Sequence, residues 1–148
     1  MIKVINRLDV WKEEPLYWEH LAAIDKILYA STIPKSLIEL IKVRVSQINK
    51  CVFCIEHHAN DALKTGELQR RIFALSAWKD SPLFTDSEKS ALQAAEEITH
   101  ISVDGLSDKT YEQLKAHFST REIADIFMCI SHINFLNRIG VSTQTVAK

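Results

Sequence analysis

The sequence is poor in the residues that build turns. It has only three glycines and three prolines in 148 residues. No Asn-Gly or Asp-Gly pair lies between two alternating, strand-like segments, which is the strongest short-range signal of a β-hairpin. We therefore predict an all-α protein of about seven helices.

The sequence also lacks an excess of charge and a long apolar run. Lysine and arginine number 18 against 19 aspartates and glutamates, a formal net charge of −1. Binding to nucleic acid or to an anionic membrane needs a basic excess or patch, so neither partner is expected. No apolar run reaches the roughly 18 residues of a membrane span, and no signal-peptide core opens the chain. We expect a cytoplasmic location.

The length and composition are ordinary for a globular protein. Hydrophobic residues make up 47% and charged residues 25% of the chain, and 148 residues are enough to bury a sizeable core. There is no repeat, low-complexity tract or linker. Residues 1–148 are predicted to form a single domain.

Apolar residues at helical spacing, interrupted by caps and breakers, divide the chain into elements. Thr85-x-x-Glu88 and Ser119-x-x-Glu122 have the spacing of capping boxes, and Gly66 is placed to end a helix. Residues 1–14 are expected to be extended, 78–85 a loop and 102–106 a turn. The expected helices span residues 15–30, 34–49, 53–66, 67–77, 85–99, 107–118 and 120–138.

The last expected helix is apolar around much of its circumference, with Ile123, Ile126, Phe127, Ile130 and Ile133. Such a helix is usually buried against more than one neighbour. In a chain this small, part of that surface is available to another subunit, so we expect a homo-oligomer.

The three cysteines are too few, and odd in number, for the disulfide framework of a secreted protein. Two of them form Cys51-x-x-Cys54, and His58 follows four residues later. In a reducing compartment such a pair is more often catalytic or metal-binding than structural. At about 100° per residue on a helix, His58 projects between the two sulfurs and His57 lies to the side.

This cluster can support thiol chemistry. A thiol reacts as its thiolate, which a helix N-terminus or a nearby base favours, and His58 can accept the proton. The second cysteine then supplies a resolving thiol, so that oxidation ends in an intramolecular disulfide. A zinc site is the rival reading, but no distant cysteine or histidine pair supplies a fourth ligand. Cys129 stands alone among apolar residues and is expected in the core.

Here the chain resembles a known family. Glu39, then Cys51-x-x-Cys54 and His58, followed by an Ala-x-x-Ala-x-x-x-Gly66 segment, is similar to the alkyl hydroperoxidase D (AhpD) core of the carboxymuconolactone decarboxylase superfamily. The similarity continues in Leu75-Ser-Ala-Trp78, Leu83-Phe-Thr-Asp-Ser-Glu88 and Glu97-Ile-Thr99, and then in Ile133-Asn-Phe-Leu-Asn-Arg138. It covers nearly the whole chain, from about residue 15 to residue 142.

The resemblance implies an all-helical subunit, assembled into trimers or hexamers, with an antioxidant peroxidase or disulfide reductase activity. It implies no metal, haem or flavin cofactor. Cys54 would be the peroxidatic cysteine and Cys51 the resolving one, and His58 with Glu39 would form a proton relay. The substrate would be a hydroperoxide. The electron donor would be a dithiol, such as a lipoyl group or a thioredoxin-like protein.

One position departs from the family. Some family members carry a histidine just before the second cysteine, where this chain has Phe53, so the surroundings of the thiol are less polar here.

Two other functions are alternatives to the peroxidase. A non-enzymatic redox sensor or metal-binding module would use the Cys-x-x-Cys and histidine cluster without turnover. A decarboxylase or other lyase of the superfamily would not depend on the cysteine pair.

Overall fold

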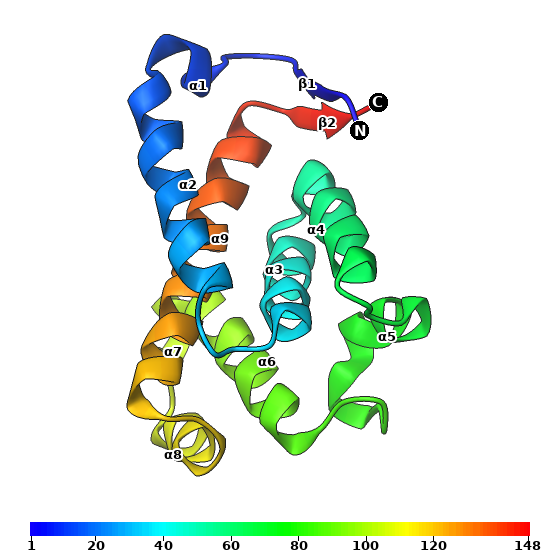
Figure 1. Cartoon of the computed structure of the whole chain (residues 1–148), viewed down its shortest axis with the longest axis vertical. Helices are drawn as coiled ribbons and strands as arrows, with labels where there is room; N and C mark the ends of the chain where they lie inside the picture. Colours follow the sequence, from blue (N-terminus) through cyan, green and yellow to red (C-terminus); the bar gives the residue numbers. More distant parts are fainter.

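The fold consists of nine α-helices, one 3-10 helix and a small two-stranded sheet (Figure 1). It is described for all of residues 1–148 in a computed structural model. In chain order the elements are β1 (Lys3–Ile5), α1 (Val10–Glu13), α2 (Pro15–Tyr29), α3 (Lys35–Asn49), α4 (Val52–Lys64), α5 (Gln69–Ala74), the 3-10 helix η1 (Leu75–Asp80), α6 (Asp86–Thr99), α7 (Ile101–Asp104), α8 (Asp108–His117), α9 (Thr120–Ser142) and β2 (Thr145–Ala147).

Helix α3 lies at the centre of the molecule and packs against α4, α6 and α9, with α2 also in contact. It is buried around most of its circumference, which is typical of a helix with several neighbours. Three of its buried residues are polar, Glu39, Lys42 and Ser46. Its full set of buried residues is Leu37, Ile38, Glu39, Leu40, Ile41, Lys42, Val43, Val45 and Ser46. Burial of charged groups at such positions requires partners, and these belong to the site described below.

Two apolar clusters hold the helices together. The larger one joins α2, α3, α6 and α9 and includes Ile41, Ile130 and Cys129. The smaller one lies under α5 and η1 and includes Trp78 and Phe84. The prediction that Cys129 is a core residue is confirmed: it is 1% exposed, and burial raises the pKa of its thiol to about 12. This cysteine is therefore inert at neutral pH.

The predicted caps are confirmed. Thr85 and Ser119 each accept a hydrogen bond from the N–H three residues on, and Glu88 and Glu122 return the second bond of a capping box. Ser107 caps α8 in the same manner. Gly66 follows α4 with φ of 92°, a left-handed conformation that glycine adopts without strain.

Several boundaries differ from the prediction. The expected helix 67–77 ends at Ala74, and the chain continues as η1 through Trp78, which the sequence placed in a loop. Residues 101–104 form the single turn α7 instead of a bare turn. The last helix runs four residues beyond Arg138, to Ser142. Short helical turns carry too weak a periodic signal to be distinguished from loops.

The prediction of a purely helical chain missed the sheet, although the chain is predominantly helical as expected. Strand β1 pairs with β2 in antiparallel register, Lys3 opposite Ala147 and Ile5 opposite Thr145. The two strands come from opposite ends of the sequence, so no hairpin signal announces them. They bring the termini together above the start of α4 (Figure 1). Residues 10–13, expected to be extended, form α1.

Two features of the helices bear on membrane insertion and on assembly. None of the helices combines the length and apolarity needed to cross a lipid bilayer. Helix α9 presents Met128, Phe135 and Val141 to solvent, each nearly half exposed. The homo-oligomer expected from this helix stays a prediction.

Candidate functional site

The candidate site begins at the tight corner between α3 and α4. Lys50 ends α3 in the left-handed conformation, with φ of 57° and ψ of 37°, and its N–H bonds back to the carbonyls of Ser46 and Gln47. Cys51 follows in an extended conformation as the N-cap of α4. Helix α4 begins one residue earlier than the expected 53–66, and Cys51 lies just before it, so the helical spacing assumed between Cys51 and His58 holds only from Cys54 onward. The corner still places the two Cα atoms 5.3 Å apart, and a disulfide joins the side chains.

The two sulfur-bearing residues have different access to ligands. Cys54 lines a cavity of about 250 Å³, together with His57 and His58. Cys51 does not line this cavity and is 1% exposed. A molecule in the cavity therefore meets the side chain of Cys54, while Cys51 can reach it only through Cys54.

Gly140 of α9 provides the space for the disulfide. A Cβ atom added at this position would lie 2.9 Å from Cys51 Sγ and 3.5 Å from Cys54 Sγ. A glycine inside a helix lowers helix stability by about 1 kcal/mol relative to alanine, and close packing is a usual reason for tolerating it. Gly140 stands out in the sequence as one of only three glycines, but the sequence does not show that it packs against Cys51 and Cys54.

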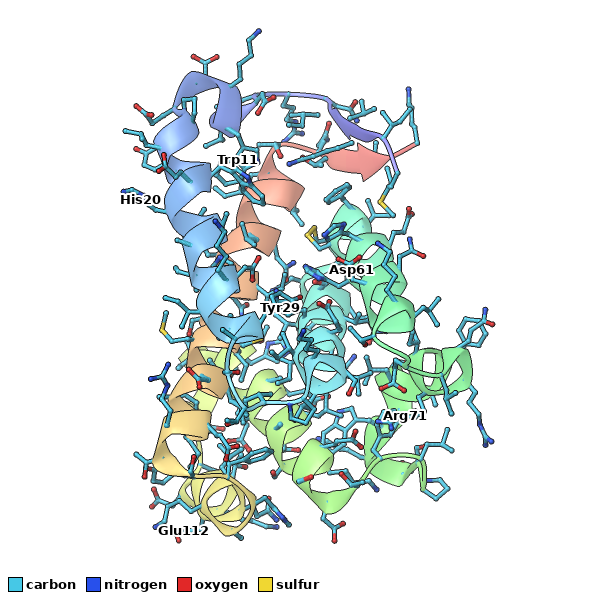
Figure 2. All side chains as sticks on the ribbon, viewed as in Figure 1. Trp11, His20, Tyr29, Asp61, Arg71 and Glu112 are labelled. Carbon is cyan, nitrogen blue, oxygen red and sulfur yellow. A yellow bond between two sulfur atoms is a disulfide. The ribbon has the colours of Figure 1, made fainter.

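His58 is held in place by Glu39. Its Nδ1 lies 2.9 Å from Glu39 Oε2, and both residues are buried. The Tyr29 hydroxyl donates a hydrogen bond to the other carboxylate oxygen of Glu39, and Tyr29 lies at the end of α2, turned towards α3 (Figure 2). Since Nδ1 faces Glu39, Nε2 is the ring nitrogen left for a thiol or a ligand.

The polar network extends away from the cysteines. Buried Lys42 donates to Asp25 Oδ1 at 2.7 Å and to the Tyr29 hydroxyl at 3.3 Å. His132 Nδ1 lies 3.4 Å from Asp25 Oδ1, within ion-pair range but without hydrogen-bond alignment. Burial would raise the pKa of Asp25, but the contacts with His132 and Lys42 outweigh it and lower the pKa from 3.8 to about 2.

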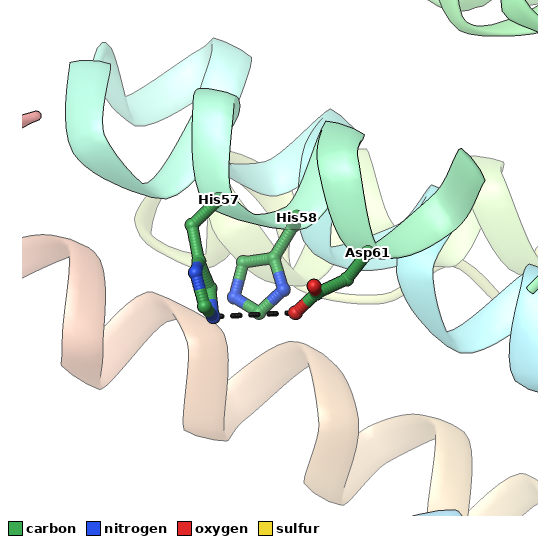
Figure 3. Close-up of side chains that lie close together, drawn as sticks. All are labelled: His57, His58 and Asp61. Carbon is green, nitrogen blue, oxygen red and sulfur yellow. Dashed lines mark ion pairs between the residues drawn. The ribbon is translucent and has the colours of Figure 1, made fainter. Parts of the chain in front are cut away.

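His57, His58 and Asp61 lie close together on one face of α4 (Figure 3), with His57 exposed and His58 buried. Three of their ligand atoms lie within 4.8 Å of one another, close enough to hold a metal ion. Asp61 is already paired with His57 Nε2 at 3.3 Å and with Lys64 Nζ at 2.7 Å. Burial lowers the pKa of His57, and the neighbouring charge of His58 lowers it further, against the charges of Asp61 and Glu39. The carboxylate of Asp61 is thus already paired with two positive or potentially positive groups of the protein.

The four predicted site residues lie together: Glu39 contacts His58, Cys51 is bonded to Cys54, and His58 and Cys54 line the same cavity. Glu39 contacts His58 and Tyr29, so any influence of Glu39 on Cys54 passes through His58. The sequence did not identify the residues that surround this relay, namely Asp25, Tyr29, Lys42, His132 and Gly140. His132, which the sequence does not single out, lies buried against Asp25. Asp25 and Tyr29 are four residues apart on α2, which places them on one face, but nothing local shows which helix that face meets.

Known proteins resemble this chain in sequence and in fold. Residues 15–97 match the carboxymuconolactone decarboxylase family. The uncharacterized protein YdfG of Bacillus subtilis (strain 168) is 35% identical over 137 residues, which are 93% of either chain.

Two solved structures share the fold. A protein of unknown function from Agrobacterium tumefaciens, described as a candidate antioxidant defence protein AhpD, is 33% identical and superposes with a TM-score of 0.89 over 94% of this chain and 95% of that one. The debrominase Bmp8, in complex with 2,3,4-tribromopyrrole, has a TM-score of 0.82 over 93% of this chain and 73% of its own. At 19% identity this second likeness concerns the fold alone.

Gly140→Ala is expected to destabilise the oxidised protein by about 1 to 3 kcal/mol, because the new methyl group overlaps Cys51 Sγ. Thermal unfolding of oxidised and reduced protein measures this. The matched control is the same substitution in a Cys51→Ala background, where the sulfur is gone and the methyl group is accommodated. Equal losses in both backgrounds would show that the disulfide is not what the added methyl group meets.

Asp25 is expected to make stability depend on pH in acid. Because its pKa is lower in the folded than in the unfolded protein, its contribution is complete above the unfolded value and is lost as the pH falls through about 2. The two pKa values differ by an amount equivalent to about 2 kcal/mol. Between about pH 5 and pH 2, the stability difference between wild type and Asp25→Asn should shrink by that amount. Urea unfolding at both pH values tests this, with Asp80→Asn, which changes an exposed carboxylate, as the control. An equal stability difference between wild type and Asp25→Asn at both pH values would contradict it.

Proposed function

The chain belongs to the carboxymuconolactone decarboxylase family as an AhpD-like member, and on that basis we propose that it is a thiol-dependent antioxidant oxidoreductase that reduces hydroperoxides. One observation carries this proposal. Cys54 lines a cavity that it shares with a buried, carboxylate-held histidine, and its sulfur is bonded to the less accessible Cys51.

The reaction starts from the reduced pair. His58 takes the proton of the Cys54 thiol at Nε2, and the position of Cys54 in the first turn of α4 favours the thiolate. The thiolate attacks the outer oxygen of the hydroperoxide, so that an S–O bond forms and the O–O bond breaks. The leaving alkoxide takes a proton from His58 and departs as the alcohol, leaving Cys54 as a sulfenic acid.

Cys51 then resolves this intermediate. Its thiolate attacks the sulfur of Cys54, the S–S bond forms, and the hydroxyl group leaves with a proton as water. The two thiols have supplied the two electrons that reduced the peroxide. The resulting disulfide is the state of the present structure. An external dithiol, such as a lipoyl group or a thioredoxin-like protein, returns the pair to the thiol state by exchange at the accessible Cys54.

Glu39 and Tyr29 position the histidine. The bond from His58 Nδ1 to Glu39 fixes the ring orientation and stabilises the imidazolium that forms when Nε2 is protonated. The Tyr29 hydroxyl fixes the other oxygen of Glu39. Phe53 beside Cys54 keeps the cavity side of the thiol less polar, which suits an organic hydroperoxide.

Replacement of Cys54 by Ser is expected to abolish hydroperoxide consumption. Cys51→Ser should still react once, ending as a sulfenic acid on Cys54. Mass spectrometry after one equivalent of hydroperoxide should show the wild type losing two hydrogens and the Cys51→Ser protein gaining one oxygen. Cys129→Ala, which changes the buried third cysteine, serves as the control and should behave as wild type. Turnover by a protein lacking both Cys51 and Cys54 would overturn the proposal and favour lyase-type chemistry.

The proton relay should appear in the pH profile. His58→Gln is expected to slow thiol oxidation at neutral pH on the order of 100-fold, a usual effect of losing a general base. This deficit should shrink as the pH rises and solvent deprotonates the thiol. Glu39→Gln should cause a smaller loss with the same pH trend, and Tyr29→Phe a smaller one still, because the carboxylate remains. Initial rates of peroxide consumption across pH, with excess dithiothreitol, test this order. A pH-independent loss in His58→Gln would contradict a role in proton transfer.

A further inference from the structure

The cavity beside Cys54 has an aromatic wall, and the ammonium group of the solvent-exposed residue Lys3 lies within cation–π range of its three rings. Lys3 Nζ lies 5.8 Å from the ring centroid of Trp11, 6.0 Å from that of Trp18 and 5.5 Å from that of Phe53. The two indole rings lie against each other, 5.6 Å between centroids. All four residues line the cavity that also contains Cys54. They come from β1, α1, α2 and α4, so four separate elements converge at this point.

The Lys3 ammonium has no anionic partner. It belongs to none of the ion pairs of the chain, whose lysine partners are Lys42, Lys64, Lys79 and Lys115. Burial lowers the pKa of Lys3, and the charge of Asp9 opposes this only in part. Cation–π contacts compensate a partly desolvated ammonium only weakly. A carboxylate brought to this position would gain a charge-assisted hydrogen bond.

The other charged groups at the cavity define which anion fits. His57 and His58 also border it, and the one carboxylate is that of Asp25. Asp25 is already neutralised by Lys42. Among the residues that line the cavity, Lys3 is the only lysine or arginine. A single carboxylate matches this single charge, whereas a dianion such as a phosphate would exceed it and would face Asp25 as well.

The remaining wall selects an apolar body of limited size. Trp11, Trp18 and Phe53 offer aromatic faces, and Ile133, Leu136 and Ile139 of α9 are aliphatic. Aromatic rings gain from stacked or edge-on contacts with such a wall. The volume of about 250 Å³ lies just below the roughly 300 to 1,000 Å³ of pockets for drug-sized ligands. A molecule with a single ring suits this space.

We propose, building on the peroxidase function proposed above, that the substrates are hydroperoxides of small aromatic carboxylic acids. Lys3 pairs with the carboxylate, Trp11, Trp18 and Phe53 contact the ring, and the peroxide group is directed to Cys54. The products are the corresponding hydroxy-acid and water, with Cys51 and Cys54 oxidised to the disulfide. Lys3 thus determines specificity and takes no part in the proton transfers.

The test compares cumene hydroperoxide bearing a para-carboxylate with its uncharged methyl ester. For wild type, kcat/KM should be about five- to tenfold higher for the acid, as expected for one partly exposed charge pair. Lys3→Gln should reduce the ratio to about one, Lys3→Glu should invert it, and Lys3→Arg should preserve it. Lys12→Gln, which removes an exposed lysine next to Trp11 but outside the cavity, is the matched control and should keep the wild-type ratio.

The kinetic outcomes separate the two proposals. tert-Butyl hydroperoxide carries neither a ring nor a charge, so its rate with each Lys3 variant measures any general effect of the substitution on the thiols. If wild type reduces none of the three hydroperoxides, the peroxidase function fails. If it reduces them but prefers the ester, or if Lys3→Gln keeps the preference for the acid, the peroxidase stands and the assignment of Lys3 is overturned.

Binding can be measured without turnover. The para-carboxylate alcohol, which is the product of the charged probe, should quench the fluorescence of Trp11 and Trp18 in the oxidised protein. The dissociation constant should rise about five- to tenfold in Lys3→Gln, by the same charge-pair reasoning. The third tryptophan, Trp78, is buried against Glu96 outside the cavity, so a Trp11→Phe/Trp18→Phe protein should show no quenching. Equal binding of the acid and its methyl ester would overturn the proposal even if peroxidase activity is absent.

Discussion

The contact between Glu39 and His58 is the constraint on which the site depends. Glu39 lies in the second turn of α3, 1% exposed, where an unpaired carboxylate would cost several kcal/mol. Its two oxygens are taken by residues of two different helices, Tyr29 of α2 and His58 of α4. Stabilising this buried charge therefore fixes three helices relative to one another. The same contact aims the histidine at the cavity, so that the need to satisfy a buried group and the need to orient a base are met by one hydrogen bond.

Much of the fold could be predicted because its signals are local. The capping boxes at Thr85 and Ser119, the glycine after α4 and the apolar spacing of α2 and α3 each depend on a few neighbouring residues. The spacing of Cys51, Cys54 and His58 is local in the same way. What could not be predicted requires knowledge of which distant elements meet. The pairing of β1 with β2, the contact of His132 with Asp25 and the clearance that Gly140 leaves for the disulfide all join residues about 90 or more positions apart. Nothing near Lys42 in the sequence shows that this lysine is buried beside Asp25.

A shared fold leaves the chemistry to the lining of one cavity. The debrominase Bmp8 shares this helical arrangement, and a shared fold does not by itself fix the reaction. In the present chain the buried relay joins α2, α3 and α4. Segments near the ends of the sequence supply another part of the lining, because Lys3, Trp11 and Thr145 all border the cavity but belong to no core cluster. Substitutions there can alter what enters the cavity without disturbing the residues around the thiols.

The small sheet has a consequence for how the cavity exchanges its contents with solvent. Two strands of three residues have little stability of their own, and here they hold the chain that carries Lys3 and Thr145 over the cavity. The helices behind them are anchored in the main core, whereas the strands are not. Segments of this kind open by local unfolding at a small fraction of the global free energy. Local opening of the paired termini would therefore uncover this side of the cavity while the relay and the disulfide corner stay folded.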